Sequence, residues 1–317
     1  MEREYAFCLR LSGITVRFVT PTPIELPDNF QPFACPDTDR PDEEYRVELL
    51  TAPLDPAVPM VHKEGEAHIY QTDRGWLQIY PDLGDDSGCQ VACLYAPDGH
   101  HTLYYPASKW EEYSKVWRCA HLISAERFLL RHDALLLHSS FVELHGKAVL
   151  FSGPSGAGKS TMADLWKTHL NARVLNGDRT IIQKTAQGFT AAGSIWAGSS
   201  GIYCQETAPL SGIFLLTQAP ENRVERLRFD AFVPLFSQTI LNSWDRDFMD
   251  RMADLFAELL DRVPVYRLYC RPDRQAVELS YHTLFGKEPP YERFLRRYPP
   301  GPEPQMRRSG HPRQRHV

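Results

Sequence analysis

The sequence lacks a long apolar segment. No run approaches the ~20 apolar residues that a membrane-spanning helix needs. Residues 1–5 carry two glutamates, whereas a secretory signal peptide begins with uncompensated positive charge. We therefore expect a soluble, cytoplasmic protein without a membrane partner.

The sequence also lacks a strong net charge and metal-type cysteine spacing. Lys and Arg number 35 against 40 Asp and Glu, and a net charge of −5 gives no global field that would attract nucleic acid. The seven cysteines form no C-x-x-C pair, and Cys89 and Cys93 have no second pair to complete a zinc site. We expect scattered reduced thiols, and we find no internal repeat.

The hydrophobic content suffices for a globular protein of about two domains, since 43% of the 317 residues are hydrophobic. Residues 1–107 alternate short β-like runs with Pro- and Asp-rich turns, which predicts an antiparallel β domain with an irregular excursion over 20–43. Residues 108–133 follow a helical period and predict a linking helix. Residues 134–285 predict an α/β domain, and the basic, Pro-rich composition of 286–317 is typical of a disordered tail.

The α/β domain is predicted from short apolar runs that alternate with amphipathic segments. The expected strands lie at 134–138, 141–144, 147–152, 172–178, 180–184, 188–192, 209–217 and 263–268. The expected helices lie at 229–243, 244–262 and 273–285, with a further helix after residue 160.

Residues 153–160, Gly-Pro-Ser-Gly-Ala-Gly-Lys-Ser, match the Walker A motif G-x-x-x-x-G-K-[ST]. An apolar run at 148–150 precedes the motif and a helical pattern follows it, which is the context that a phosphate-binding loop requires. The glycines let successive backbone N–H groups converge on a phosphate, and the N-terminus of the following helix also favours an anion. The residues expected to bind ATP are Gly153, Ser155, Gly156, Ala157, Gly158, Lys159, Ser160 and Thr161.

Two of these residues have specific roles in such a motif. Lys159 would reach the β- and γ-phosphates, and the Ser160 hydroxyl would bind Mg²⁺. The second metal ligand is normally an acid at the end of a nearby strand, and Asp178, which ends the run 172–178, fits this place. The alternative is that Asp178 is only a turn residue after Asn-Gly. ATP and Mg²⁺ are therefore the expected cofactors.

The sequence around this motif resembles the HPr kinase/phosphorylase group, whose nucleotide fold is shared with phosphoenolpyruvate carboxykinase. In that group a His begins a strand fifteen residues before the first glycine of the loop, as His138 precedes Gly153 here. An Asp-Asp-Arg-like segment follows the next helix, and the matching residues 177–179 are Gly-Asp-Arg. The similarity covers about residues 135–220 and implies an α/β, overall α+β, protein whose core is a mixed sheet.

The resemblance also implies catalytic roles for His138, Lys159 and Asp178. A neutral His is suited to proton transfer, and a core His bonded to backbone is the alternative for His138. Members of the group usually carry two adjacent acids, whereas this chain has Gly177 before Asp178. Phosphoryl transfer depends chiefly on positioning and charge neutralisation, so the loss of one acid need not abolish it.

Further candidates lie outside the motif. The 193–201 loop holds three glycines and three serines around one Trp, and we expect it to close over phosphates or the acceptor, the alternative being a plain surface loop. Glu143 and Glu206 are weaker candidates for a base. Arg223 and Arg226 could neutralise phosphate charge, or could lie in a solvated turn.

The resulting hypothesis is an ATP- and Mg²⁺-dependent kinase that transfers the γ-phosphoryl group to a hydroxyl of a protein, a peptide or a small molecule. One alternative is an ATP-binding or ATP-hydrolysing switch or accessory protein without phosphotransfer. A second is a carboxykinase-like phosphotransferase. The sequence disfavours an ABC ATPase, which needs a Leu-Ser-Gly-Gly-Gln-like signature, and a GTPase, which needs Asn-Lys-x-Asp. Whether the protein forms a homo-oligomer is left open.

Overall fold

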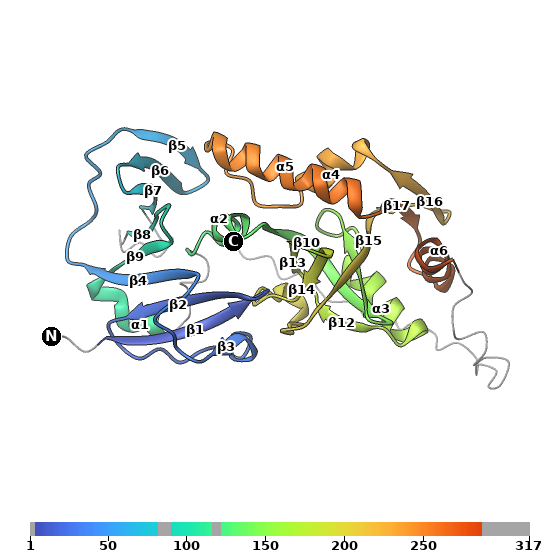
Figure 1. The fold of residues 1–317 in the computed structure, drawn as a ribbon, viewed down its shortest axis with the longest axis horizontal. Coiled ribbons are helices and arrows are strands. Elements are labelled where there is room, and N and C mark those ends of the chain that lie inside the picture. The colour runs from blue at the N-terminus through green and yellow to red at the C-terminus, as the bar shows by residue number, and fades with distance from the viewer. Residues whose placement is uncertain (1–3, 82–89, 116–121, 287–317) are drawn as a thin grey trace, which may run out of the picture.

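The computed structural model describes residues 4–81, 90–115 and 122–286. In these residues the chain forms two mixed β-sheets, one from the N-terminal part and one from the C-terminal part, with helices beside them (Figure 1). The fold is therefore mixed α+β, in agreement with the coarse prediction from sequence.

The first sheet has nine strands within the described residues, in the order β3-β1-β2-β4-β9-β8-β7-β6-β5. The strands are β1 Tyr5–Leu11, β2 Ile14–Thr20, β3 Ala34–Cys35, β4 Glu43–Leu50, β5 Met60–Glu64, β6 Ala67–Thr72, β7 Gly75–Tyr80, β8 Val91–Tyr95 and β9 His100–Pro106. The predicted purely antiparallel domain is wrong, because β4 runs parallel to both β2 and β9. A parallel pair needs a long crossover, and the excursion at 21–42 supplies the one between β2 and β4.

The second sheet has eight strands within the described ranges. The strands are β10 Ala134–Leu144, β11 Lys147–Ser152, β12 Arg173–Asn176, β13 Arg179–Thr185, β14 Gly188–Ala192, β15 Thr207–Gln218, β16 Arg223–Leu227 and β17 Val265–Cys270. The pairings β10-β13-β14-β15-β11 close into a ring, because β11 pairs with both β15 and β10. β12 pairs with β10 outside this ring, and β17 and β16 extend the sheet from β15.

Strand β10 is continuous where the sequence predicts two strands. The polar pair Ser139 and Ser140 interrupts the apolar pattern, but both side chains are fully buried and hydrogen-bonded. Ser139 Oγ donates to Thr180 Oγ1 at 2.9 Å, and Ser140 Oγ donates to the Gly177 carbonyl at 3.3 Å. These hydrogen bonds offset the cost of burying two hydroxyls, so the strand continues through them.

Helices cover the second sheet on both faces. The α-helices of the described residues are α1 Trp110–Lys115, α2 Ala125–Arg131, α3 Lys159–Leu170, α4 Phe232–Phe236, α5 Arg246–Arg262 and α6 Arg274–Phe285, and α1 packs with the first sheet. α5 buries an apolar stripe against one face together with α4, and α3 and α6 pack on the other face around Trp166 (Figure 1). A third apolar cluster joins the first sheet, α1 and α2 to Leu136 and Ile181 of the second sheet, so the two sheets share a core.

Other predicted segments differ in extent. The segment 108–133 was predicted as one linking helix, and its residues 116–121 lie outside the described residues. The described part contains the two short helices α1 and α2, and Ser124 before α2 has a left-handed φ of 41°. The predicted helix at 229–243 is reduced to α4. The predicted tail at 286–317 lies outside the described residues except for Gly286. Within residues 4–81, 90–115 and 122–286, no helix is long and apolar enough to cross a membrane.

A buried acid joins the end of α2 to the first sheet. Glu43 contacts Nε2 of both His101 and His132 at 2.8 Å and Nε of Arg131 at 3.3 Å. His101 Nδ1 accepts a hydrogen bond from the Ala96 N–H, so the neutral ring donates from Nε2. Burial lowers the pKa of His101 below its ordinary 6.5. Burial raises the pKa of Glu43, but hydrogen bonds from the two histidines outweigh it and hold the pKa below 4.5.

Both shifts predict that acid destabilises the protein. Below pH 6.5 the unfolded chain binds a proton on His101 that the folded chain does not bind, and below pH 4.5 the same holds for Glu43. Stability from both groups is thus fully present at pH 7 and falls with decreasing pH, by up to about 1.4 kcal/mol per pH unit for each group. Urea unfolding at several pH values would measure this loss.

His101→Gln is the control, because its amide does not titrate. We expect the stability difference between parent and His101→Gln to shrink as the pH falls below 6.5. A difference that stays constant from pH 7.5 to 5 would contradict the assignment of a neutral, acid-sensitive His101.

Candidate functional site

The 153–158 loop joins β11 to α3, so it lies between a buried strand and the N-terminus of a 12-residue helix. Gly153, Gly156 and Gly158 have φ values of 146°, 79° and 102°, which residues with a Cβ rarely adopt. A Cβ at Gly156 or Gly158 would meet no heavy atom within 4 Å, so the loop borders open space there. The first amides of α3 have no partner within the helix and favour an anion. This geometry suits a phosphate group.

Lys159 folds back onto the loop. Its Nζ donates to the Gly153 carbonyl at 3.0 Å and to the Pro154 carbonyl at 3.2 Å, and the residue is 8% exposed. Burial lowers the pKa of Lys159, and the charge of Asp178 opposes this effect. Because both hydrogen-bond acceptors are neutral carbonyls, phosphate oxygens could replace them without breaking an ion pair.

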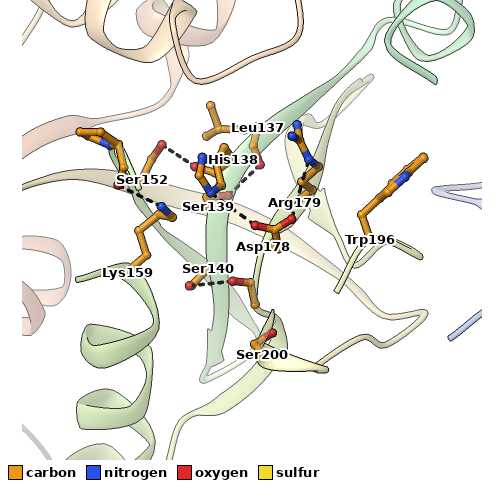
Figure 2. Close-up of polar contacts among 12 residues, drawn as sticks. Leu137, His138, Ser139, Ser140, Ser152, Lys159, Asp178, Arg179, Trp196 and Ser200 are labelled. Carbon is orange, nitrogen blue, oxygen red and sulfur yellow. Dashed lines mark hydrogen bonds and ion pairs between the residues drawn. The ribbon is translucent and has the colours of Figure 1, made fainter. Parts of the chain in front are cut away.

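Asp178 and His138 lie next to each other in the second sheet, which also leads into the 153–158 loop (Figure 2). His138 Nε2 lies 3.3 Å from Asp178 Oδ1, and Arg179 Nε lies 3.8 Å from Asp178 Oδ2. Both His138 and Asp178 are about a quarter exposed, at 27% and 29% of their side chains. Burial lowers the pKa of His138, the charges of Lys159 and Arg179 lower it further, and Asp178 opposes them. His138 is therefore neutral at neutral pH.

The backbone around His138 is held from two sides. Its carbonyl accepts a hydrogen bond from Ser152 Oγ at 2.9 Å, and its N–H donates to the Gln238 carbonyl at 2.9 Å. The next residue, Ser139, donates its N–H to the Asp178 carbonyl at 2.9 Å. Three segments therefore meet β10 at His138 and Ser139. They are the end of β11, the start of β13 and the segment after α4.

Asn176 fixes the segment that carries Asp178. Its fully buried side chain accepts hydrogen bonds at Oδ1 from the N–H groups of Asp178 and Arg179, at 3.0 and 2.9 Å. Its Nδ2 donates to the carbonyls of Ser194 and Trp196, at 3.1 and 3.3 Å. One amide thus forms the turn before Asp178 and ties that turn to the 193–201 loop.

The 193–201 loop lies directly over this turn. A Cβ at Gly177 would overlap Ser200 Oγ, and a Cβ at Gly198 would lie 2.7 Å from Asp178 Cγ. Ser200 Oγ also donates to the Ala197 carbonyl at 2.6 Å. The position where the resemblance places a second acid is therefore occupied by Ser200, and the loop covers one side of the Asp178 carboxylate.

A cavity of about 1010 Å³ opens on the other side of the 193–201 loop. Asp178, Arg179 and Trp196 line this cavity, together with residues of the first sheet and of α2. In Figure 2, Asp178 and Arg179 lie between Lys159 on one side and Trp196 on the other. A smaller cavity of about 500 Å³ lies beside Gly158 and Thr161, at the start of α3.

Some predicted residues lie elsewhere. Glu143 and Glu206, the weaker base candidates, both pair with Arg173. Arg223 and Arg226 belong to the unpredicted strand β16 rather than a turn, and their guanidinium groups stack on Tyr269 and Tyr266 of β17. These contacts give the four residues structural partners away from Asp178.

The sequence analysis missed Asn176 as a site residue. The Asn-Gly dipeptide before Asp178 indicates a turn, but the sequence does not show that the amide also reaches the 193–201 loop. The sequence also gave no sign that α2 and the first sheet supply a wall of a cavity at Asp178. Some of these lining residues lie more than a hundred positions before Asp178 in the chain.

The fold and site together define a mixed α+β protein with a glycine-rich loop between strand and helix, and an Asp–His pair beside it. The chain belongs to the family described as "SynChlorMet cassette protein ScmC", whose model matches residues 111–271. No curated protein sequence matches the chain.

One solved structure with a matching region is the HPr(Ser) kinase/phosphatase from Coxiella burnetii. The two are 12% identical, and the match covers 52% of this chain and 98% of that chain, with a TM-score of 0.28. A TM-score this low carries no argument about function, so the function has to be argued from the site itself.

The close contact between Gly177 and Ser200 yields a prediction. Gly177→Ala should lower the free energy of unfolding by about 1–3 kcal/mol, because the added methyl overlaps Ser200. The double variant Gly177→Ala/Ser200→Gly should recover part of this loss, with Ser200→Gly alone as control. Urea unfolding of the four proteins gives the coupling. If the changes in the free energy of unfolding are fully additive, the methyl group of Gly177→Ala makes no steric clash with Ser200.

Proposed function

We propose that the protein is an ATP- and Mg²⁺-dependent kinase that transfers the γ-phosphoryl group of ATP to a hydroxyl group. The observation that carries the proposal is the position of Asp178. Its carboxylate lies 3.3 Å from His138, next to the part of β10 that pairs with the end of β11 before the loop, and it also lines the cavity of about 1010 Å³. An acid between a phosphate-type loop and a large cavity can act where donor and acceptor meet.

The reaction joins an acceptor oxygen to the γ-phosphorus and breaks the bond between that phosphorus and the β–γ bridging oxygen. The products are a phosphate ester, ADP and the proton of the acceptor hydroxyl. The protein has to hold the two substrates in line and neutralise charge, which are the main contributions to such transfers.

The nucleotide side is supported by the open face of the 153–158 loop. Backbone N–H groups of the loop and of the start of α3 would hold the phosphates, together with Lys159. Thr161 lines the cavity of about 500 Å³, which also borders Gly158 and Arg271. That cavity offers room for the nucleoside on the side of the loop away from Asp178.

The oxygen donors near the loop fit magnesium. Ser160 and Asp178 are hard oxygen ligands, and within the described residues no cluster of three or more His, Cys, Asp or Glu side chains could hold a metal alone. Mg²⁺ commonly takes only one or two protein ligands and completes its shell with phosphate and water. When bound, the metal neutralises phosphate charge. Ser160 and Asp178 would hold it.

His138 would act beside Asp178. Its neutral ring lies 3.3 Å from the Asp178 carboxylate and is partly exposed, so it can form a hydrogen bond to a phosphate oxygen or to the acceptor hydroxyl. Arg179, which lines the same cavity, can neutralise charge on the transferred group.

One observation favours the second candidate, an ATP-binding switch without phosphotransfer. Ser200 occupies the space next to Gly177, so the site has a single acid where kinases of the resembled group have two. The proposals differ in product, because the switch releases only inorganic phosphate. Thin-layer separation of γ-labelled products in the presence of cell extract distinguishes them.

The nucleotide site gives a direct prediction. Lys159→Ala should weaken ATP binding about tenfold to a hundredfold, because a hydrogen bond to a charged group contributes about 1.5–3 kcal/mol. Lys167→Ala removes an exposed lysine from the same helix and should leave binding unchanged. Equilibrium binding of a fluorescent ATP analogue measures both. Equal affinity of parent and Lys159→Ala would remove the basis of the kinase proposal.

Substitutions of Asp178 and of His138 should differ in how they change the Mg²⁺ dependence of turnover. Asp178→Asn should raise the Mg²⁺ concentration needed for half-maximal turnover, since a neutral amide is a poor ligand for a hard cation. His138→Ala should reduce turnover by ~10²-fold at unchanged Mg²⁺ dependence and unchanged ATP affinity. Asp164→Asn, on the exposed face of α3, is the control. An unaltered Mg²⁺ requirement in Asp178→Asn would assign the metal to another acid.

A further inference from the structure

The cavity at Asp178 has a second polar wall, which has no role in the proposed function. Glu64 at the end of β5, Tyr80 at the end of β7 and Glu126 in the first turn of α2 line it. These residues come from the first sheet and α2, whereas Asp178 comes from the second sheet. The cavity is therefore built by both parts of the chain, and each part contributes different polar groups.

Glu126 is the most buried acid of this wall. The residue is 7% exposed, and one carboxylate oxygen accepts a hydrogen bond from Asn242 Nδ2 at 3.1 Å. The donor is a neutral amide that comes from the segment before α5. Burial raises the pKa of Glu126. The hydrogen bond from Asn242 and the charge of Arg127 oppose this rise, and the charge of Glu64 adds to it. An acid in such a place is stabilised in its ionised form by a cation.

Tyr80 lies on the same wall as the two acids. Burial raises the pKa of Tyr80 to about 12, and the charges of Glu126 and Glu64 contribute. Glu64 accepts a hydrogen bond from the neutral Trp244 Nε1 at 3.0 Å. Two carboxylates and a phenol therefore share this wall of the cavity. The hydrogen bonds to Glu126 and Glu64 come from neutral side chains, those of Asn242 and Trp244.

Two arginines near this cavity have other acid partners. Arg127, next to Glu126, donates to Asp245 at 2.5 Å and lies over the rings of Tyr95 and Trp244, and its charge also lowers the pKa of Glu126. Arg179 lines the cavity beside Asp178. Within the described residues neither arginine forms an ion pair with Glu64 or Glu126, so a ligand that brought its own positive charge could pair with these carboxylates.

Apolar and aromatic side chains also line the cavity. Phe30, Leu136 and Ile195 are buried in the lining, and Trp196 and Tyr203 are partly exposed there. Such a lining accommodates the uncharged body of a ligand, while the polar groups fix its direction.

We propose that this cavity binds the phosphoryl acceptor, and that the acceptor carries an amine or guanidinium group as well as its hydroxyl. The cation lies between Glu64 and Glu126, and the hydroxyl lies at Asp178. The inference rests on the proposed kinase function, since it names the substrate class of that site. The positively charged group comes from a small amino alcohol or from a Lys or Arg side chain of a serine-containing peptide.

Defined probes test the proposal. One pair is an amino alcohol and the diol of the same chain length, and the other is a short peptide with one Ser and one Lys and its variant with norleucine for Lys. Binding to the full chain is measured by saturation-transfer NMR and titration in the presence of Mg²⁺ and a non-hydrolysable ATP analogue. We expect the cationic member of at least one pair to bind about tenfold to a hundredfold more tightly. Which pair responds identifies the source of the cation.

Two isosteric substitutions localise the effect. Glu64→Gln/Glu126→Gln should abolish the preference for the cationic probe, and it should leave binding of the ATP analogue unchanged. Glu66→Gln, at an exposed acid of the same hairpin, should keep the preference. Thermal unfolding checks that the double variant is folded, and Glu64→Gln alone, at an exposed position, should reduce the preference if the double variant does not fold.

The outcomes separate this inference from the kinase proposal. If no cationic probe binds more tightly than its neutral partner, or if the glutamine variants keep the preference, the inference is wrong, whatever the protein phosphorylates. If cationic probes bind through Glu64 and Glu126 but receive no phosphoryl group from Mg²⁺-ATP, the cavity assignment stands and the kinase proposal fails.

Discussion

The candidate site depends on the register of one strand, β10. His138 is paired with Arg179 of β13, and the next residue, Ser139, is paired with Ser152 at the end of β11. Two consecutive residues of β10 therefore bring the start of the 153–158 loop next to the residue that follows Asp178. A shift by one residue would turn the His138 side chain to the opposite face of the sheet and separate it from Asp178. Buried Ser139 and Ser140 hold this register through side-chain hydrogen bonds.

The sequence predicted what local patterns determine. The Walker A match predicted a strand before and a helix after the 153–158 loop, and β11 and α3 lie there. The spacing of His138 before Gly153 predicted one antiparallel strand pair between them, and β10 pairs with β11 in this way. The apolar stripe of α5 was also recognised from its helical period. Each of these depends on residues that are close in sequence, where spacing alone fixes geometry.

Features that depend on distant residues were not predicted. The parallel placement of β4 follows from pairings with β2 and β9, which local alternation of polar and apolar residues cannot report. Gly177 was interpreted as the loss of an acid, whereas the structure shows that Ser200 fills the space that a side chain there would need. The double role of Asn176 likewise becomes visible only when the 193–201 loop lies over the turn.

The arrangement of the cavity bears on the choice between a kinase and a switch. Hydrolysis needs access for one water molecule at the loop, and a space of about 1010 Å³ lined by two parts of the chain is far larger than that. Glu126 is buried in the lining of this cavity, and its carboxyl group accepts a hydrogen bond from Asn242. Asp178 lines this cavity and lies beside His138, next to the part of β10 that pairs with the end of β11, so the kinase proposal depends on the placement of Asp178 more than on the loop alone.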